Sequence, residues 1–396
     1  MGAAAKMLKF MEQSSWIRKM FEEGARLRAI YGSDRVCDFS LGNPNVYPPE
    51  VVHQELVNLA KSSTGASHGY MPNAGLPEVR EAIAEYISPV HGVSFTAEDI
   101  VMTCGAAGAM NVILKALLDP GDEVLVPAPY FVEYGFYADN HGGILKPIPT
   151  TDDFLPDLDA LENAISPKTK VLILNSPNNP TGQVYGEALL RDISEILSKR
   201  STDLNRPIYI VSDEPYRNIA FDGIEVPSVL KFYSRSIIAT SYSKDLCLAG
   251  ERIGYLAVHP EMEKKDSLLG ALVLANRILG FVNAPAFMQR LVARLQGITV
   301  DPMTYQKKRD MLVAAMKEIG YEFIVPKGAF YLFPKSPVPD DVEFVRMLQE
   351  ELILVVPGSG FGKPGYFRIA FCVDDEVISR SFNGFEKAYK KALSNS

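Results

Sequence analysis

Between residues 99 and 260 the chain alternates short apolar runs with longer amphipathic segments, and this pattern restricts the fold more than any other feature. The runs that we expect to form strands are residues 99–103, 123–127, 144–149, 170–176, 207–214, 236–243 and 251–258. Several of them are almost continuously apolar, as strands are when helices cover both faces of a parallel sheet. The segments between them, such as Gly186–Lys199, have helical periodicity. The pattern therefore predicts an α/β domain in which a mostly parallel sheet lies between helices.

The last part of the chain follows a different pattern, which is typical of an α+β unit with a small core of its own. We expect helices at 302–319 and 341–350, strands at 322–325, 329–334 and 366–371 with one more strand before the last, and a final helix. Residues 262–295 have helical periodicity and are predicted to form a long helical stretch that bridges the two units. No flexible linker separates the units, so we expect them to pack closely.

The composition is that of an ordinary globular protein, with 396 residues, of which 47% are hydrophobic and 22% charged, and a formal net charge of −8. Lys and Arg are not clustered, which argues against a nucleic-acid or anionic-membrane surface. Cys37, Cys104, Cys247 and Cys372 are far apart and the histidines are isolated from them, so neither a metal site nor a disulfide framework is indicated. No run reaches the roughly 18 apolar residues of a membrane span, and the first residues lack the apolar region of a secretion signal. We therefore expect a cytoplasmic protein.

The first candidate binding feature lies at the end of the first expected strand, because ligands of open parallel sheets bind beyond the carboxyl ends of the strands. That strand runs into the small residues Cys104–Gly108, which open a helix. Backbone N–H groups at a helix N-terminus favour an anion such as phosphate, although a tight strand-to-helix turn explains the same residues. The next strand lacks the terminal acidic residue of a dinucleotide site and ends before Tyr130. A dinucleotide cofactor is therefore disfavoured.

Three further groups follow apolar strands. Asp213 ends one of them, and its carboxylate needs a partner, which helix capping or a protonated heterocyclic nitrogen would provide. Lys244 directly follows another; most lysines are solvated surface groups, but desolvation at this place would give the neutral amine that Schiff-base chemistry requires. Arg252 offers a bidentate phosphate contact, and Asn178 and Asn179 offer amides or a simple turn. A phosphate cradle, an acid for a pyridinium and an amine for an aldehyde together match pyridoxal 5′-phosphate (PLP).

The motif order GNP, GY, PNNPTG, DEPY, SYSK, ERIGY and FRIAF resembles that of the class I/II aminotransferases of PLP fold type I over nearly the whole chain. The resemblance implies a large α/β domain, with its mostly parallel sheet between helices, and a smaller α+β domain. On this basis we divide the chain into an N-terminal segment of the small domain (1–48), the large PLP-binding domain (49–283) and the C-terminal part of the small domain (284–396).

The resemblance also implies roles for single residues. Lys244 matches the lysine that forms the Schiff base with PLP, Asp213 the partner of the pyridine nitrogen, and Tyr216 the partner of the cofactor's phenolic oxygen. It also implies that Asn179 lies beside that oxygen and that Tyr130 stacks on the ring. Ser241, Arg252 and the amides of Ala106 and Ala107 match the ligands of the phosphate. Tyr70 matches a tyrosine that reaches the phosphate from a neighbouring subunit. Gly42 and Arg368, again with Asn179, match the site of the substrate's α-carboxylate. A homodimer with shared active sites is therefore implied.

The predicted activity is ping-pong transfer of an amino group from an L-amino acid to a 2-oxo acid such as 2-oxoglutarate, with Lys244 as general base and acid. Aspartate or glutamate is favoured as donor. One subgroup of the family reads the distal carboxylate with an arginine from the partner subunit, shortly before an Asn-x-Pro. Arg277 lies near that place, with a spacing from Asn283 about one residue longer, and a solvated or ion-paired helical residue explains it as well.

Other activities stay open. Alanine or aromatic amino acids are the nearest alternative donors, and a PLP-dependent carbon–sulfur β-lyase uses the same kinds of lysine, aspartate and arginine. From a different class, a non-catalytic ligand-sensing module of the kind fused to bacterial regulators is a further alternative, although no basic DNA-binding extension is present.

Overall fold

A seven-stranded sheet forms the centre of the larger domain in the computed structural model, which describes residues 2–12 and 16–395. Its strands lie in the order β2-β8-β7-β6-β5-β3-β4. They are β2 (Ile100–Thr103), β3 (Glu123–Pro127), β4 (Ile144–Ile148), β5 (Thr169–Asn175), β6 (Tyr209–Asp213), β7 (Ser236–Ser241) and β8 (Gly254–Val258). Only β8 runs antiparallel to its neighbours in this sheet of described residues. The predicted mostly parallel sheet is therefore confirmed.

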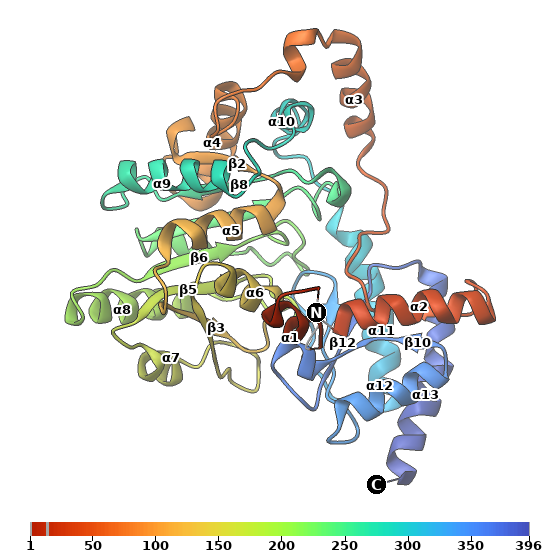
Figure 1. The fold of residues 1–396 in the computed structure, drawn as a ribbon. Helices are drawn as coiled ribbons and strands as arrows, with labels where there is room; N and C mark the ends of the chain where they lie inside the picture. The colour runs from red at the N-terminus through yellow and green to blue at the C-terminus, as the bar shows by residue number, and fades with distance from the viewer. Residues whose placement is uncertain (1, 13–15, 396) are drawn as a thin grey trace.

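Helices cover both faces of this sheet (Figure 1). Val124 and Leu125 are adjacent on β3 and belong to different core clusters, one containing α5, α6 and α9 and the other α3, α4, α7, α8 and α10. This double burial explains why the strands are almost continuously apolar. The helices of the large domain are α3 (Glu50–Ser62), α4 (Pro77–His91), α5 (Gly105–Leu117), α6 (Glu133–Asn140), α7 (Leu158–Ala164), α8 (Glu187–Asp203), α9 (Lys265–Ile278) and α10 (Ala286–Ala293).

The small domain combines the two ends of the chain in one hydrophobic core. β1 (Cys37–Asp38) pairs in parallel with β10 (Ile353–Leu354), which joins the N-terminal segment to the C-terminal part. The other elements of this domain are α2 (Trp16–Tyr31), α11 (Pro302–Ile319), β9 (Tyr331–Leu332), α12 (Asp341–Glu350), β11 (Val356–Pro357), β12 (Phe367–Ala370) and α13 (Asp375–Asn395). The short helix α1 (Ala5–Glu12) lies apart from them, beside α6 of the large domain (Figure 1).

The strand expected at 322–325 does not form. Phe323 and Ile324 are partly buried against the small-domain core, so the apolar pattern of this segment reflects burial and not strand pairing. The strand expected at 329–334 is also shorter than predicted, since β9 spans Tyr331–Leu332.

The long helical stretch expected at 262–295 is two separate helices, α9 and α10. Gly280 and Val282 between them have φ of +89° and +60°, which an α-helix does not allow. The apolar residues of α10 and Leu295 pack with α3 and α4 in the large domain, whereas Val300 packs in the small-domain core. This packing favours a domain boundary between Leu295 and Val300, and we propose it in place of residue 283.

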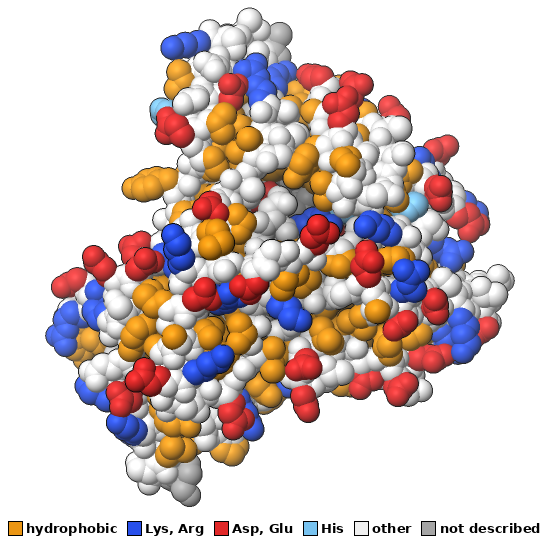
Figure 2. All heavy atoms as spheres, turned by 180° about the vertical axis from the view of Figure 1, so that it is seen from behind, with side chains coloured by type: hydrophobic (Ala, Val, Ile, Leu, Met, Phe, Trp, Pro, Cys, Tyr) orange, Lys and Arg blue, Asp and Glu red, His pale blue; other side chains and the backbone are white. Residues whose placement is uncertain are grey.

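The surface carries both signs of charge. On the face shown in Figure 2, acidic and basic side chains are interspersed with hydrophobic ones and do not form a field of one sign. Within the described ranges, no helix combines the length and apolar character that crossing a bilayer requires. The four cysteines are free, and the part of the chain that the structure describes contains no group of three His, Cys, Asp or Glu residues arranged to hold a metal ion.

Candidate active site

A cavity of about 700 Å³ lies at the carboxyl edge of the central sheet. The last residues of three adjacent strands line it: Asn175 of β5, Asp213 of β6 and Ser241 of β7. The first turn of α5 forms another part of the wall, and β9 and β12 of the small domain close the opposite side. The domains thus meet over the place where parallel strands of an α/β sheet present their ligand-binding groups.

Lys244 enters this cavity from the turn after β7. Its Nζ donates a hydrogen bond to the backbone oxygen of Gly42 at 2.7 Å and lies 5.6 Å from the centre of the Phe330 ring. Burial lowers the pKa of this amine, and the positive charges of Arg368 and Arg252 lower it further, while the nearby thiol groups of cysteine oppose the shift. The site therefore favours the neutral, nucleophilic form of the lysine.

Asp213 lies at the end of β6 and is 7% exposed. The Tyr134 hydroxyl donates to its Oδ2, but its buried Oδ1 has no hydrogen-bond partner among the described residues. Burial raises the pKa of Asp213 to about 7, against the opposing effect of the Tyr134 hydrogen bond. A buried acceptor without a donor is costly, so this oxygen is suited to an N–H group of a bound molecule, best a cationic one.

The N-terminus of α5 provides a site for an anion. Cys104 at the helix start makes no side-chain capping bond, and Ala106 and Ala107 of the first turn line the cavity. Arg252 lies so close to this turn that a Cβ on Gly105 would be 3.0 Å from its Nη2. Free N–H groups, the positive end of the helix dipole and a guanidinium therefore point to one phosphate-sized region.

Two serines complete this region of the cavity wall. The Ser241 hydroxyl donates to the Ser243 hydroxyl at 3.0 Å, and both side chains line the cavity. Ser241 ends β7 and Ser243 directly precedes Lys244, so both hydroxyl groups belong to the segment that carries the amine.

Arg368 of β12 is 1% exposed at the floor of the cavity. Its Nη1 donates to Asn179 Oδ1 at 3.0 Å and its Nη2 to the backbone oxygen of Ser40 at 2.6 Å, while its buried Nε has no partner among the described residues. The rings of Tyr331 and Phe361 lie 4.6 and 4.8 Å from the guanidinium carbon. A guanidinium that is buried, oriented and without an anionic partner is suited to bind a carboxylate in two-point fashion.

Tyr216 and Tyr331 form a pair that links the domains. Their hydroxyl oxygens are 2.8 Å apart, and both side chains line the cavity. Burial raises the pKa of Tyr216 well above its usual value and that of Tyr331 to about 12, so both phenols stay protonated. The sequence indicated Tyr216, but Tyr331 comes from a strand of the other domain and no motif pointed to it.

Tyr130, the residue expected to stack on the cofactor ring, does not line the cavity. Its backbone N–H donates to Phe361, and its ring lies against Gly362 of the small domain. The next residue, Phe131, lines the cavity instead. Together with Tyr134, Phe131 was missed because both positions depend on the orientation of the chain as it enters α6.

Tyr70 and Arg277 lie outside the cavity of their own chain. The Tyr70 side chain is 96% exposed. Arg277, at the end of α9, is exposed and makes no ion pair or side-chain hydrogen bond with any described residue. Within one chain the structure therefore does not bring these two residues to the others.

The entrance of the cavity is mainly aromatic. Phe10 of α1 packs edge-on against Phe136 of α6 at 5.0 Å between ring centres, and both line the cavity together with Phe131. Lys6 forms an ion pair with Asp139 that also joins α1 to α6. The first helix thus forms part of the wall of the cavity.

One acid lies among these aromatic residues. Glu133 lines the cavity, and burial raises its pKa. It is paired with no Lys or Arg among the described residues. The lining cations are Lys244, Arg252 and Arg368, and none of these is near enough to form an ion pair with it. In its ionised form Glu133 would oppose an anionic group in its vicinity.

Comparisons with known proteins agree with this site. The family model described as aminotransferase class I and II matches residues 34–383. A probable aspartate aminotransferase of Methanocaldococcus jannaschii is 33% identical over 89% of this chain and 93% of its own. An aromatic-amino-acid aminotransferase of Thermococcus litoralis is 30% identical over 96% of this chain and 97% of its own.

Two solved structures have the same fold. An amino transferase from Eubacterium rectale is 42% identical with a TM-score of 0.95, covering 99% of both chains. The aspartate aminotransferase of Thermus thermophilus with maleate is 26% identical with a TM-score of 0.87, covering 98% of this chain and 100% of that one.

Proposed function

The chain belongs to the class I and II aminotransferases, and from this premise we propose that it transfers the amino group of an L-amino acid, aspartate or glutamate first, to a 2-oxo acid such as 2-oxoglutarate. The observation that carries the proposal is that one cavity contains both the partly buried Lys244 amine, whose pKa is lowered, and the buried Asp213 carboxyl, which has a free oxygen. The family implies PLP as cofactor, and these residues fit it.

The chain's own groups match the parts of PLP. Asp213 Oδ1 would accept the hydrogen bond of a protonated ring nitrogen, which removes the unsatisfied acceptor. Tyr216 and Asn179 would hold the phenolic oxygen. Phe131, rather than Tyr130, would pack on the face of the ring. The residues that we assign to the phosphate are Ala106, Ala107, Ser241 and Arg252. Bound PLP supplies an aldehyde that combines with amines and a ring that accepts the electron pair released at Cα of an amino acid.

Within this site Lys244 has two tasks. Its amine would hold the cofactor, and when that amine is free it would accept the proton from the substrate's Cα. Arg368 orients the substrate by binding its α-carboxylate, with the Asn179 amide and the Gly42 backbone beside it. The keto acid product leaves before the second substrate binds, so the kinetics are expected to be ping-pong.

We further propose a cytoplasmic homodimer in which Tyr70 and Arg277 act in the partner's cavity. Support comes from the exposure of both side chains, which do not line the cavity of their own chain. In such a dimer Arg277 would bind the distal carboxylate of aspartate or glutamate.

A second candidate donor is an aromatic amino acid. Phe10, Phe131 and Phe136 give the entrance an apolar wall, and Glu133 disfavours a second carboxylate near it. The names of relatives support either reading, since they include aspartate, aspartate/prephenate and aromatic-amino-acid aminotransferases.

A half-transamination screen tests the proposal. Purified PLP-loaded enzyme is mixed with each common amino acid in the absence of a 2-oxo acid, and loss of the visible absorption is followed. If the absorption is lost fastest with aspartate or glutamate, these acidic amino acids are the donors. If it is lost fastest with aromatic amino acids, the second candidate donor is supported. Release of pyruvate and ammonia from cysteine conjugates without any acceptor would indicate a β-lyase and contradict both.

A further inference from the structure

Two acids, the first buried and the second partly buried, follow the two central residues of the site directly in sequence. Glu214 comes after Asp213, and Asp245 comes after Lys244. While Asp213 and Lys244 line the large cavity, Glu214 and Asp245 line a second, internal cavity of about 40 Å³ behind the sheet edge. Each turn therefore presents one side chain to the active site and the next to this inner cavity.

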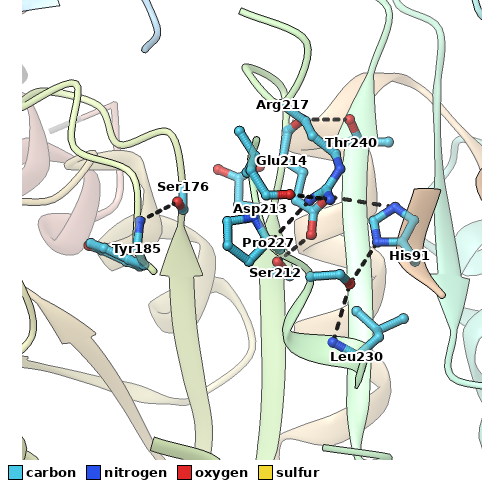
Figure 3. A network of polar contacts seen from close by, with 12 residues as sticks. His91, Ser176, Tyr185, Ser212, Asp213, Glu214, Arg217, Pro227, Leu230 and Thr240 are labelled. Atoms are coloured by element: carbon cyan, nitrogen blue, oxygen red, sulfur yellow. Dashed lines mark hydrogen bonds and ion pairs between the residues drawn. The ribbon is translucent and has the colours of Figure 1, made fainter. Parts of the chain in front are cut away.

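Glu214 is held by a network of its own. It accepts hydrogen bonds from Ser212 at 2.6 Å and from Arg217 at 3.2 Å, and its backbone oxygen accepts one from Thr240 at 3.1 Å. Figure 3 shows Glu214 and Arg217 together between strand β6 and His91. His91 approaches Glu214 at 3.8 Å, but burial lowers the pKa of this histidine to about 4, so the contact is not an ion pair at neutral pH.

Asp245 is connected to the neighbouring turn instead. Asn218 Nδ2 donates to Asp245 Oδ2 at 3.1 Å, and the Leu246 backbone N–H donates to Oδ1 at 2.9 Å. No Lys or Arg among the described residues forms an ion pair with Asp245. Burial raises the pKa of this carboxyl to about 7, and the Asn218 bond acts against that rise.

The Asn218–Asp245 bond joins two turns that carry active-site groups. Asn218 is two residues after Tyr216, and Asp245 is one residue after Lys244. The Tyr216 turn is also tied to the small-domain side, because Ala329 N–H donates to the oxygen of Ile219 at 2.8 Å. The Lys244 turn is tied to the segment before α11, because Val300 N–H donates to the oxygen of Asp245 at 2.7 Å. The side-chain bond therefore adds a direct link between the two turns, beyond the Thr240–Glu214 bond at the ends of their strands.

We propose that Asn218 and Asp245 are positioning residues whose hydrogen bond sets the place of the Tyr216 phenol relative to the Lys244 amine. The inference rests on the proposed function, since it concerns the geometry of two groups that face the same bound cofactor. A small displacement of either turn changes how both groups meet the reacting atoms, and misplacement of about 1 Å costs as much as 100-fold in rate.

The test uses the PLP-loaded enzyme and the variants Asn218→Ala and Asp245→Ala, singly and together. We expect each single variant to lower kcat by about 10-fold, with the KM for the amino donor changed less than about 2-fold. The double variant should be no worse than either single one, since both remove the same bond. The pH at which the visible band of the lysine-bound cofactor titrates should shift in all three.

Two further variants separate a positioning role from a loss of folding. Asp245→Asn keeps the size and an acceptor oxygen, and the exchange Asn218→Asp with Asp245→Asn restores donor and acceptor with their places reversed. Both should regain kcat to within about 3-fold of wild type. Asn58→Ala is the matched control, because Asn58 on α3 also donates a side-chain hydrogen bond of 3.1 Å to an acid, Glu55, but lines neither cavity. It should leave kcat and the titration unchanged.

Several results would overturn the inference. The first is that both alanine variants keep the wild-type kcat and titration. The others are additive losses in the double variant, no recovery in the exchanged pair, or losses no larger than that of Asn58→Ala. A wild-type enzyme that forms no visible band or does not transaminate would instead contradict the proposed function, and that result is read before any variant is made.

Discussion

The Tyr134 hydroxyl donates to one oxygen of the buried Asp213 carboxyl, while the other oxygen has no partner among the described residues. The phenol favours the ionised carboxyl, against burial, which raises its pKa to about 7. The free oxygen is left for a cationic donor from the bound cofactor. Tyr134 thus prepares Asp213 for a task that the carboxyl cannot perform when protonated.

Replacing Tyr134 tests this relationship. Tyr134→Phe removes the donor, so the pKa of Asp213 should rise further and the ionised form should appear only at higher pH. We expect kcat to fall by about 10-fold and the acidic limb of the pH–rate profile to move to higher pH. Tyr185→Phe, at another fully buried tyrosine outside the cavity, is the control. An unmoved acidic limb in Tyr134→Phe would contradict the role given to this phenol.

Arg368 should not be replaceable by lysine. A single ammonium cannot keep the bonds to Asn179 and Ser40 and also bind a carboxylate at two points. For Arg368→Lys we expect kcat/KM for amino acids to fall by roughly 100-fold and the affinity for a simple dicarboxylate such as maleate to fall in parallel. Steady-state kinetics and spectral titration measure the two quantities. Retention of both within a few-fold would show that the α-carboxylate binds elsewhere.

Glu133 should influence the choice of donor. Its charge opposes a distal carboxylate, so Glu133→Gln is expected to raise kcat/KM for aspartate by roughly 5-fold, corresponding to about 1 kcal/mol. The value for phenylalanine should change less than about 2-fold. Glu85→Gln, on the exposed side of α4, serves as control. Equal changes for both donors would mean that Glu133 does not face the substrate's side chain.

Arg277 is also tested by its effect on donor preference, but here the replacement should lower kcat/KM for aspartate instead of raising it. If the partner's copy binds the distal carboxylate, Arg277→Gln should lower kcat/KM for aspartate by about 100-fold and leave that for alanine unchanged. Nearby Arg290 donates to the Ser67 backbone and does not line the cavity, so Arg290→Gln is a suitable control. An unchanged aspartate value would remove Arg277 from the site.

His91 is expected to cause part of the pH dependence of the free energy of unfolding. Its pKa is lowered from 6.5 to about 4 by burial, so below about pH 6.5 the unfolded chain binds a proton that the folded chain does not. Stability is therefore lost as the pH falls toward 4, by about 2 kcal/mol at pH 5 relative to pH 7. His91→Gln should lack this contribution, so its unfolding midpoint should fall less between the two pH values. A parallel fall in wild type and variant would contradict the assignment.

Several of the site residues that sequence reasoning identified, among them Asp213, Ser241 and Lys244, end apolar strands or closely follow them. Lys244 and Asp213 could be placed because neighbouring parallel strands end at the same edge, whatever their separation in sequence. The α/β architecture and the joining of both chain ends in the small domain also followed from pattern and resemblance.

Other features depended on information that a linear pattern lacks. The conformation of the chain as it enters α6 decides whether Tyr130 or Phe131 faces the cavity. The two residues are adjacent, so an error of one position in the sequence assignment selects the wrong ring. Tyr331 reaches Tyr216 only when the domains are docked. The division of the stretch at 262–295 into α9 and α10 depends on two positive φ values, one of them at Val282, a residue type that rarely adopts such a conformation.

The central claim is that Lys244 is the residue that holds the cofactor. The most direct measurement is borohydride reduction of the PLP-loaded enzyme, followed by proteolysis and mass spectrometry of the pyridoxyl-modified peptide, with Lys244→Ala as the paired sample. We predict the modification on Lys244 in the wild type and neither modification nor visible absorption in the variant. A modification on a different lysine of the wild type, or a Lys244→Ala protein that still absorbs in the visible and transaminates, would contradict the account.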